Sequence, residues 1–223
     1  MRLPVALVIL ASTSAAIAGP DWTEIPDARK IPPAQVIPFS PVNSIMGELI
    51  GLDAAGGADT ADLYVVTLGP GGGTVKTGSG SPLREANFDT ILAVFNMDGT
   101  GVVANDDVGP GDTSSQVTIS TSGTFLVAVA AKGVQPASAG GIMFNIYSPG
   151  NQFAQVPPNN PAGNMPVANW SGTPIDPEPR NYLAHVTHGS PAVPAVSEVA
   201  LVVLGAGFAV GAFMMLRRGL PVG

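Results

Sequence analysis

Residues 88–107 read FDTILAVFNMDGTGVVANDD, and this stretch decides the fold class. Thr90–Asn96 and Gly101–Ala104 are rich in β-branched and other apolar residues, which favour strands. Between them, Asn96-Met-Asp-Gly99 has the composition of a tight hairpin turn, since Asp-Gly is a strong turn dipeptide. The stretch therefore predicts two antiparallel strands joined by a short turn.

Short apolar runs separated by Gly, Asp, Asn and Ser continue on both sides of this hairpin. Further strands are predicted at Ile45–Leu52, Ala61–Leu68, Gly73–Thr77, Ser115–Ser120, Thr124–Ala131 and Ile142–Tyr147. In the second and fifth of these runs both alternating faces are apolar, which is typical of central strands covered on two sides. Strands at this spacing, without a helical pattern between them, predict an all-β domain, an antiparallel β-sandwich over residues 45–147.

Composition narrows the function classes. The chain of 223 residues has a net charge of −7, which argues against nucleic-acid binding, because phosphate neutralisation needs a basic face. It has no cysteine, so disulfides, a thiol nucleophile and thiolate metal sites are excluded. With 28 glycines and 22 prolines, it favours turns over helices.

Proline-rich segments flank the predicted sandwich. Residues 19–44 hold six prolines and are expected to form an extended lead-in, in which Val36, Ile37 and Phe39 can pair at a sheet edge. Residues 148–192 hold nine prolines and are interpreted as a semi-rigid spacer. The alternative for this second segment is a last strand of the domain, formed by Asn181–Val186.

The first 18 residues have the pattern of a secretory signal peptide. A basic start at Arg2 precedes the apolar run Leu3–Leu10, and Ala16-Ile17-Ala18 has the small-x-small cleavage pattern. Gly19 is the expected first residue of the exported protein. An uncleaved membrane anchor is the alternative.

Residues 199–216 contain no charged residue, and as a helix they would be about 27 Å long, close to the thickness of a bilayer core. The basic pair Arg217 and Arg218 follows, which predicts a transmembrane helix with a cytoplasmic C-terminus and an exported body. A buried core helix is the alternative.

The C-terminal tail resembles the PEP-CTERM family of bacterial sorting signals. Val193-Pro194-Ala195 stands where that family has its proline-containing motif, ahead of the apolar stretch and the two arginines. Ala195 replaces the usual Glu and Val196 replaces the second proline, as in variant Val-Pro-Ala tails. The resemblance implies recognition by an exosortase, a membrane-embedded transpeptidase-like enzyme, and delivery to the cell surface or beyond.

Acidic side chains gather in the predicted turns of the sandwich. Carboxylate and amide oxygens are the ligands that Ca²⁺ prefers, although the spacing is not that of an EF-hand. The candidate calcium ligands are Asp59, Asp62, Asp89, Asn105, Asp106 and Asp107. The alternative is that they are solvated turn residues.

Four sequence blocks resemble, in order, the bacterial pre-peptidase C-terminal domain family. They are Asp59-Thr-Ala-Asp62-Leu-Tyr64, Phe88–Gly99, Ala104–Asp107 and Gly123–Val129. The resemblance implies a jelly-roll-like β-sandwich and, in some members, Ca²⁺ held by acidic loops. Members attached to peptidases are non-catalytic modules that bind substrate or assist secretion.

Two residue pairs could support chemistry. His185 and His188 would need a helix to align as metal ligands, and Gly189 and Pro191 oppose one. Asp89 with Asp106 could form a carboxylate pair of the glycosidase type, but aspartates in turns fit metal binding or solvation better. We therefore expect a non-enzymatic surface or matrix protein that contacts an extracellular polysaccharide or another surface molecule. The alternative is an accessory or cryptic hydrolase module of a secreted degrading system.

Overall fold

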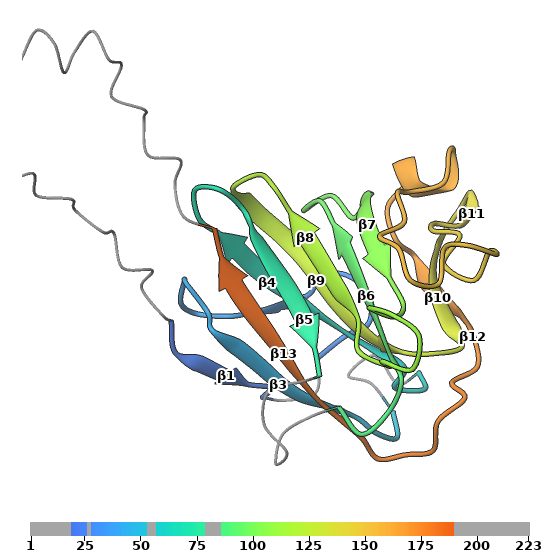
Figure 1. The fold of residues 1–223 in the computed structure, drawn as a ribbon, viewed down its shortest axis with the longest axis horizontal. Helices are drawn as coiled ribbons and strands as arrows, with labels where there is room; N and C mark the ends of the chain where they lie inside the picture. Colours follow the sequence, from blue (N-terminus) through green and yellow to red (C-terminus); the bar gives the residue numbers. More distant parts are fainter. Residues whose placement is uncertain (1–18, 26–27, 53–56, 79–85, 190–223) are drawn as a thin grey trace, which may run out of the picture. The chain divides into compact units, whose positions relative to one another are not determined.

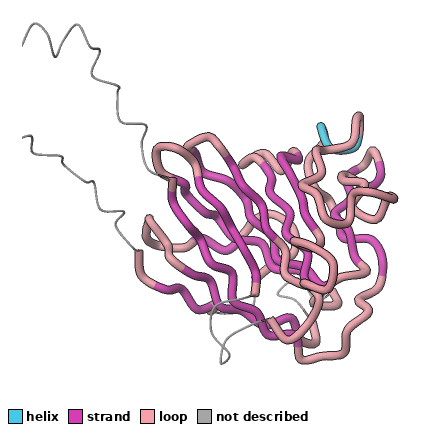
Figure 2. The backbone as a smooth tube through the Cα atoms, viewed as in Figure 1, coloured by secondary structure: helices cyan, strands magenta, loops and turns pink. Residues whose placement is uncertain are grey.

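The computed structural model of the chain describes residues 19–25, 28–52, 57–78 and 86–189. These residues form β-strands and one turn of 3-10 helix, η1 (Ala162–Asn164), so the predicted all-β class is confirmed (Figure 2). The strands form three sheets, which pack around two apolar cores.

Two five-stranded sheets face each other (Figure 1). Sheet A has the order β1 (Asp21–Thr23), β3 (Ser44–Leu49), β13 (Arg180–His188), β5 (Gly73–Thr77) and β8 (Gln116–Ile119). Sheet B has the order β2 (Gln35–Val36), β4 (Ala61–Leu68), β9 (Gly123–Ala131), β6 (Thr90–Phe95) and β7 (Gly101–Asn105). The edge pairs β1–β3 and β2–β4 are parallel and the other pairs are antiparallel. The sheets are thus mixed, not wholly antiparallel as predicted.

β6 and β7 form the predicted hairpin. The amide of Gly99 donates to the carbonyl of Asn96, and the amide of Asn96 donates to the carbonyl of Thr100, each at 2.8 Å. Gly99 has a φ of 86°, a left-handed conformation that glycine adopts without steric cost. The Asp-Gly dipeptide therefore closes the hairpin as the sequence indicates.

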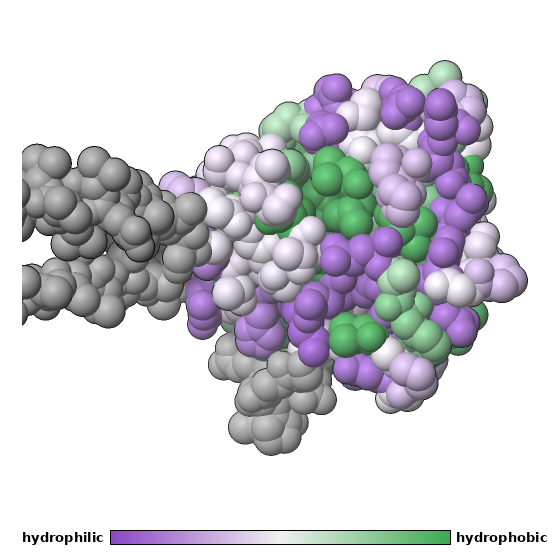
Figure 3. Space-filling model, turned by 45° about the horizontal axis from the view of Figure 1, so that its top comes forward, coloured by the Kyte–Doolittle hydropathy of each residue, from purple (hydrophilic) through white to green (hydrophobic). Residues whose placement is uncertain are grey.

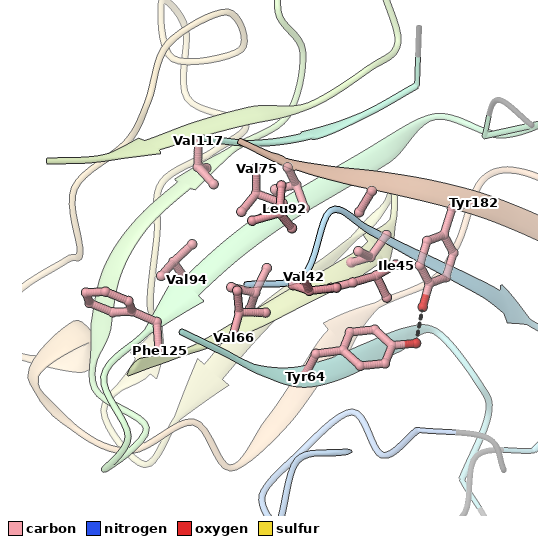
Figure 4. Packing of buried hydrophobic residues seen from close by; sticks show 14 of the residues in the cluster. Val42, Ile45, Tyr64, Val66, Val75, Leu92, Val94, Val117, Phe125 and Tyr182 are labelled. Carbon is pink, nitrogen blue, oxygen red and sulfur yellow. Dashed lines mark hydrogen bonds between the residues drawn. The ribbon is translucent and has the colours of Figure 1, made fainter. Parts of the chain in front are cut away.

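The main apolar core lies between sheets A and B (Figure 4). Alternate residues of each strand point into it, as the period of two along a strand requires. Sheet A contributes Ile45, Leu49, Val75, Val117, Tyr182, Ala184 and Val186, and sheet B contributes Tyr64, Val66, Leu92, Val94, Phe125, Val127 and Val129.

A second core covers the other face of sheet B. It contains Leu63, Ile91, Ala93, Phe95, Leu126 and Ala128 of sheet B together with Met143, Phe144, Ile146, Val156 and Val167. The covering segment includes a small third sheet with the order β11 (Gly141–Ile142), β10 (Val134–Ser138) and β12 (Asn169–Gly172). The prediction that β4 and β9 are covered on both faces is confirmed, because each face of sheet B has its own core.

The domain extends beyond the predicted limits of residues 45 and 147. β13 pairs with β3 over six residue pairs and with β5 over five, so it lies in the middle of sheet A. For the described part of residues 148–192 the spacer interpretation is wrong, and the alternative of a last strand holds. The physical reason is the alternation of Tyr182, Ala184 and Val186, which places three apolar side chains in the main core.

The proline-rich lead-in also belongs to the fold, since β1 and β2 pair with β3 and β4. The predicted strand Ile142–Tyr147 is wrong beyond its first residue, because β11 is Gly141–Ile142. The second core instead contains the buried side chains of Met143, Phe144 and Ile146.

The surface drawn in Figure 3 is largely hydrophilic, with separate hydrophobic patches. Exposed apolar side chains of the domain include Ile50, Leu52, Phe153 and Ile175. Scattered apolar side chains of this kind are ordinary on a soluble surface and need no partner to explain them.

Several predicted features lie outside the described residues. They are the signal peptide 1–18, the motif Val193-Pro194-Ala195, the helix 199–216 and the basic pair Arg217–Arg218. Backbone contacts divide the chain into residues 1–191 and 192–223. Within the described ranges, no helix has the length and apolarity needed to cross a bilayer.

Candidate cation site

Three of the predicted acidic residues meet at one end of sheet B. Asp89 immediately precedes β6, whereas Asp106 and Asp107 immediately follow β7. Because β6 is antiparallel to β7 and to β9, its beginning lies beside the ends of both neighbours. Lys132, which directly follows β9, reaches the same place.

The Lys132 ammonium group contacts all three carboxylates. Its Nζ lies 2.9 Å from Asp89 Oδ2, 3.3 Å from Asp107 Oδ2 and 3.4 Å from Asp106 Oδ2. One ammonium therefore faces three carboxylates, which leaves the cluster with an excess of negative charge when all groups are ionised. We call Asp89, Asp106, Asp107 and Lys132 the acidic cluster.

The acidic cluster keeps unused acceptor atoms. The Oδ1 atoms of its three aspartates are buried and have no hydrogen-bond partner. Asp106 itself is only 1% exposed. Buried acceptors normally have a partner, and a bound cation is one partner that would satisfy these three oxygens.

Burial and like charge shift the proton equilibria of the cluster. Burial, and after it the charge of Asp107, raises the pKa of Asp106 to about 7. Burial also raises the pKa of Asp89, although the hydrogen bond from Lys132 partly offsets it. Burial lowers the pKa of Lys132, but the hydrogen bond to Asp89 and the charge of Asp106 outweigh burial, so the net shift is upward.

The shift at Asp106 has a definite sign for stability. The folded protein binds the Asp106 proton more tightly than the unfolded chain, whose carboxyl keeps its ordinary pKa near 4. The contribution of Asp106 to stability is therefore fully present below about pH 4 and falls as the pH rises through about 7. A bound cation would reverse this loss by stabilising the carboxylate form.

Neighbouring groups fix the cluster in place. The amide of Asp89 donates to Asp176 Oδ2 at 3.0 Å, and the amide of Lys132 donates to the carbonyl of Asp89 at 2.9 Å. The hydroxyl of Ser115 donates to the carbonyl of Asp106. Burial raises the pKa of Tyr147 to about 12, and its hydroxyl accepts a 2.6 Å hydrogen bond from the Gly133 amide.

The donor set fits a hard cation. One carboxylate oxygen from each of the three aspartates lies within 4.8 Å of the others. Two oxygens that bind one Ca²⁺ at its usual distance lie at most about 5 Å apart, so the three could share an ion. Ca²⁺ takes six to eight oxygen ligands, and the remainder would come from second carboxylate oxygens, backbone carbonyls and water.

Asn105 does not join the acidic cluster. Its Oδ1 accepts from the Gln116 amide at 2.8 Å, and its Nδ2 donates to the carbonyls of Asp107 and Ala154, each at 3.1 Å. These bonds use both hydrogens of Nδ2 and one lone pair of Oδ1. Asn105 thus positions the loop that carries Asp106 and Asp107.

Asp59 and Asp62 also lie apart from the cluster. Asp62 is fully buried and accepts a 2.6 Å hydrogen bond from the Tyr182 hydroxyl, which lies 2.6 Å from the Tyr64 hydroxyl (Figure 4). Burial, and next the charge of Asp62, raises the pKa of Tyr182 well above its ordinary value. Asp59 accepts a hydrogen bond from the Ile50 amide. Asp62 therefore links β4 of sheet B to β13 of sheet A. Asp59 links the residue after β3 to the loop before β4.

The two histidines do not form a metal pair. Both lie on β13, where residues three apart point to opposite faces of the sheet. His188 Nε2 lies 2.9 Å from the carbonyl of Val42, whereas His185 lies opposite Lys76 on β5.

Sequence reasoning missed Lys132, Asp176 and Tyr147. The available signal for Lys132 was its place directly after a predicted central strand. A lysine at a strand end beside acidic turns is a candidate counter-ion.

The comparisons with known proteins leave the family open. No protein-family model matches the chain, and no curated protein matches it.

Proposed function

We propose that this chain is an exported, non-enzymatic surface protein whose β-sandwich is held at one end and displayed at the other. The observation that carries the proposal is the position of the two ends of the described domain. The signal-peptide and sorting-tail patterns of the sequence supply the route of export and delivery.

The two ends of the domain meet beside Val42 and Asn43. The Asn43 amide donates to the Pro20 carbonyl at 3.0 Å, and the Val186 amide donates to the Asn43 carbonyl at 2.8 Å. The predicted leader ends at Ala18 and the predicted motif begins at Val193, so both connect to this end. A tail that anchors the chain would therefore hold the sandwich by the end that holds Val42.

The acidic cluster lies at the other end of the sandwich. From His188 back to Arg180, β13 spans eight residue steps, or about 26 Å at roughly 3.3 Å per residue. At its beginning, Arg180 Nε donates to the Asp176 carbonyl at 2.9 Å, and Asp176 contacts Asp89. A cation site at this position would face away from the anchored end.

The strand order supports a jelly-roll-like sandwich, as the pre-peptidase C-terminal resemblance implies. Along the chain, β3, β5, β8 and β13 belong to sheet A, and they alternate with β4, the β6–β7 hairpin and β9 of sheet B. Such alternation is typical of the paired Greek keys of a jelly roll. β10 to β12 are an addition between the last two strands of this pattern.

We further propose that the acidic cluster binds Ca²⁺, with Asp89, Asp106 and Asp107 as ligands. When bound, the ion would offset the excess negative charge of the cluster and would contact the unused Oδ1 atoms. Lys132 is 24% exposed at its side chain, so its ammonium can move toward solvent as the ion enters. The cluster then serves to fix the far end of the sandwich.

Calcium is expected to raise the melting temperature of the purified protein. Binding to the folded state alone stabilises it by about 2.7 kcal/mol at a hundredfold excess over Kd. The shift should be larger at pH 8 than at pH 5.5, because Asp106, with a pKa of about 7, must lose its proton to bind. Differential scanning calorimetry with Asp106→Asn as the control checks this. No shift of the unaltered protein with millimolar Ca²⁺ at pH 8 would exclude the site.

One observation favours the alternative of a cryptic hydrolase, namely a carboxyl of pKa about 7 beside a second carboxyl. Against it, both carboxylates are paired with the Lys132 ammonium, at 2.9 Å for Asp89 and 3.4 Å for Asp106. Hydrolysis of a polysaccharide by the protein, abolished in Asp89→Ala, would favour the alternative.

The display proposal is tested on the exported protein itself. Mass spectrometry of the mature chain should find Gly19 as its first residue and a C-terminus close to Pro194.

A further inference from the structure

The outer face of sheet A carries a polar groove. It encloses about 320 Å³ and is lined by Asn43, Thr74, Lys76, Gln116, His185, Val186 and Thr187. These residues come from β13, β5 and β8 and from the residue before β3. The groove thus lies on the face of the sheet opposite to the main core.

Strand register aligns the groove residues in two rows. His185 lies opposite Lys76, and Lys76 lies opposite Gln116. In the next row Thr187 lies opposite Thr74, whose hydroxyl is 3.1 Å from that of Thr118. With strands about 4.8 Å apart, each row spans roughly 10 Å, which exceeds the size of a single small anion.

The charge of the groove differs from that of the chain. Its lining includes no carboxylate, although the chain has 16 acidic and 9 basic residues. A carboxylate that contacts the lining is that of Asp21, whose Oδ1 accepts a 3.1 Å hydrogen bond from Asn43 Nδ2. The acidic group that Lys76 influences is Asp112, outside the lining. Hydrogen bonds from Ser114, and more weakly the charge of Lys76, lower the pKa of that carboxyl. Lys76 therefore presents a positive charge in a groove whose other polar groups are neutral amides, hydroxyls and an imidazole.

We infer that the groove binds a segment of an acidic polysaccharide. The Lys76 ammonium, with His185 beside it, would pair with a sugar carboxylate, since charge-assisted hydrogen bonds are the stronger ones. Gln116, Asn43 and Thr187 would bond the hydroxyls of the same and adjoining sugar units. The two rows offer a charged contact and neutral hydrogen-bonding groups over a length of more than one sugar unit. A linear sugar chain fits this arrangement. This inference names a ligand class for the displayed module and rests on the proposed display function.

The test is a calorimetric titration of the full-length protein with a defined oligogalacturonate in calcium-free buffer. The fully methyl-esterified form of the same oligosaccharide is the matched ligand, because it keeps the sugar chain and loses the charge. We expect the acid form to bind and the ester to bind at least about tenfold more weakly. Binding of the acid form should weaken as salt is added.

Lys76→Gln is expected to lower the affinity for the acid form about tenfold, because it removes the charge and keeps a polar side chain of similar length. Arg29→Gln is the matched control. It removes one exposed positive charge outside the groove and should change affinity less than twofold. Unchanged melting temperatures would show that both variants are folded.

In the titrations with oligogalacturonate, three results would overturn the inference. They are no binding of the acid form, equal binding of acid and ester, and an unchanged affinity in Lys76→Gln. Equal binding of an oligoglutamate of the same charge would also overturn it, in favour of an acidic peptide. Because this titration uses purified protein, its failure is separate from a failure of export, which the mature termini report.

Discussion

A variant that ends at Pro179 is expected to be unfolded, whereas one that ends at Gly189 should melt cooperatively. β13 lies between β3 and β5, so its removal divides sheet A and exposes the main core. It also removes Tyr182, Ala184 and Val186, and burying a Leu- or Phe-sized side chain is worth about 2 kcal/mol. These losses, together with the apolar faces of β3 and β5 that lose their neighbour, are comparable to the usual stability of a domain, which is about 5–15 kcal/mol. Circular dichroism with thermal melting distinguishes the two variants.

A point substitution tests the same strand without shortening the chain. Ala184→Asp would place a charge at a fully buried position between the sheets, and His185→Asn is the control on the outer face of the same strand. Cooperative melting of both the Pro179-terminated variant and Ala184→Asp would contradict the central position of β13. It would instead support a domain that ends near Tyr147.

Lys132→Met is expected to destabilise the protein by about 3 kcal/mol at pH 8 in the absence of Ca²⁺. Methionine keeps the apolar stem of lysine but leaves three carboxylates together without their ammonium, and removal of one partner of a buried ion pair costs about 3–5 kcal/mol. Because the Lys132 side chain is 24% exposed, we expect a loss of stability at the lower end of this range. Urea denaturation measures it as a shift in midpoint at constant slope.

Two comparisons isolate the charge effect of Lys132. Arg29→Met removes an exposed positive charge elsewhere and should change stability by less than about 0.5 kcal/mol. At pH 5 the loss in Lys132→Met should shrink, because Asp106, whose pKa is about 7, is then largely protonated. Equal stability of Lys132→Met and the unaltered protein at pH 8 would show that the cluster needs no internal cation.

The strands with the clearest local pattern could be predicted from sequence. β4 and β5 have the predicted bounds, since dense β-branched runs there end at Gly69 and Gly78. The two-sided apolar pattern of β4 and β9 also predicted their burial on both faces. In these strands local composition and tertiary environment favour the same structure.

Other strands depend on tertiary pairing. β10 contains Pro136, which lowers local strand propensity, and β12 has the sequence Asn-Trp-Ser-Gly, with one large apolar residue. Their pairing with each other over four residues, not their composition, makes them strands. β13 has clear alternation, but the prolines before it favoured an extended spacer.

The acidic cluster could be predicted in part. Asp89, Asp106 and Asp107 stand at the ends of predicted neighbouring strands, so their convergence follows from the hairpin. Asp62 shares the residue type but not the location, because it is buried between the sheets. Asn105 lies beside the cluster, but its side-chain amide is bonded to Gln116, Asp107 and Ala154. The order of the strands in the sheets decides which acidic residues meet. The spacing of these residues along the chain does not reveal that order.

The measurement that tests the proposed function most directly is intact-mass analysis of the protein recovered from the surface of its native cells. Export with tail processing predicts a chain that begins at Gly19 and ends close to Pro194. The folded domain, including β13 up to His188, would then be complete in the mature protein. A chain that begins at Met1 and is recovered from inside the cell would contradict the proposal.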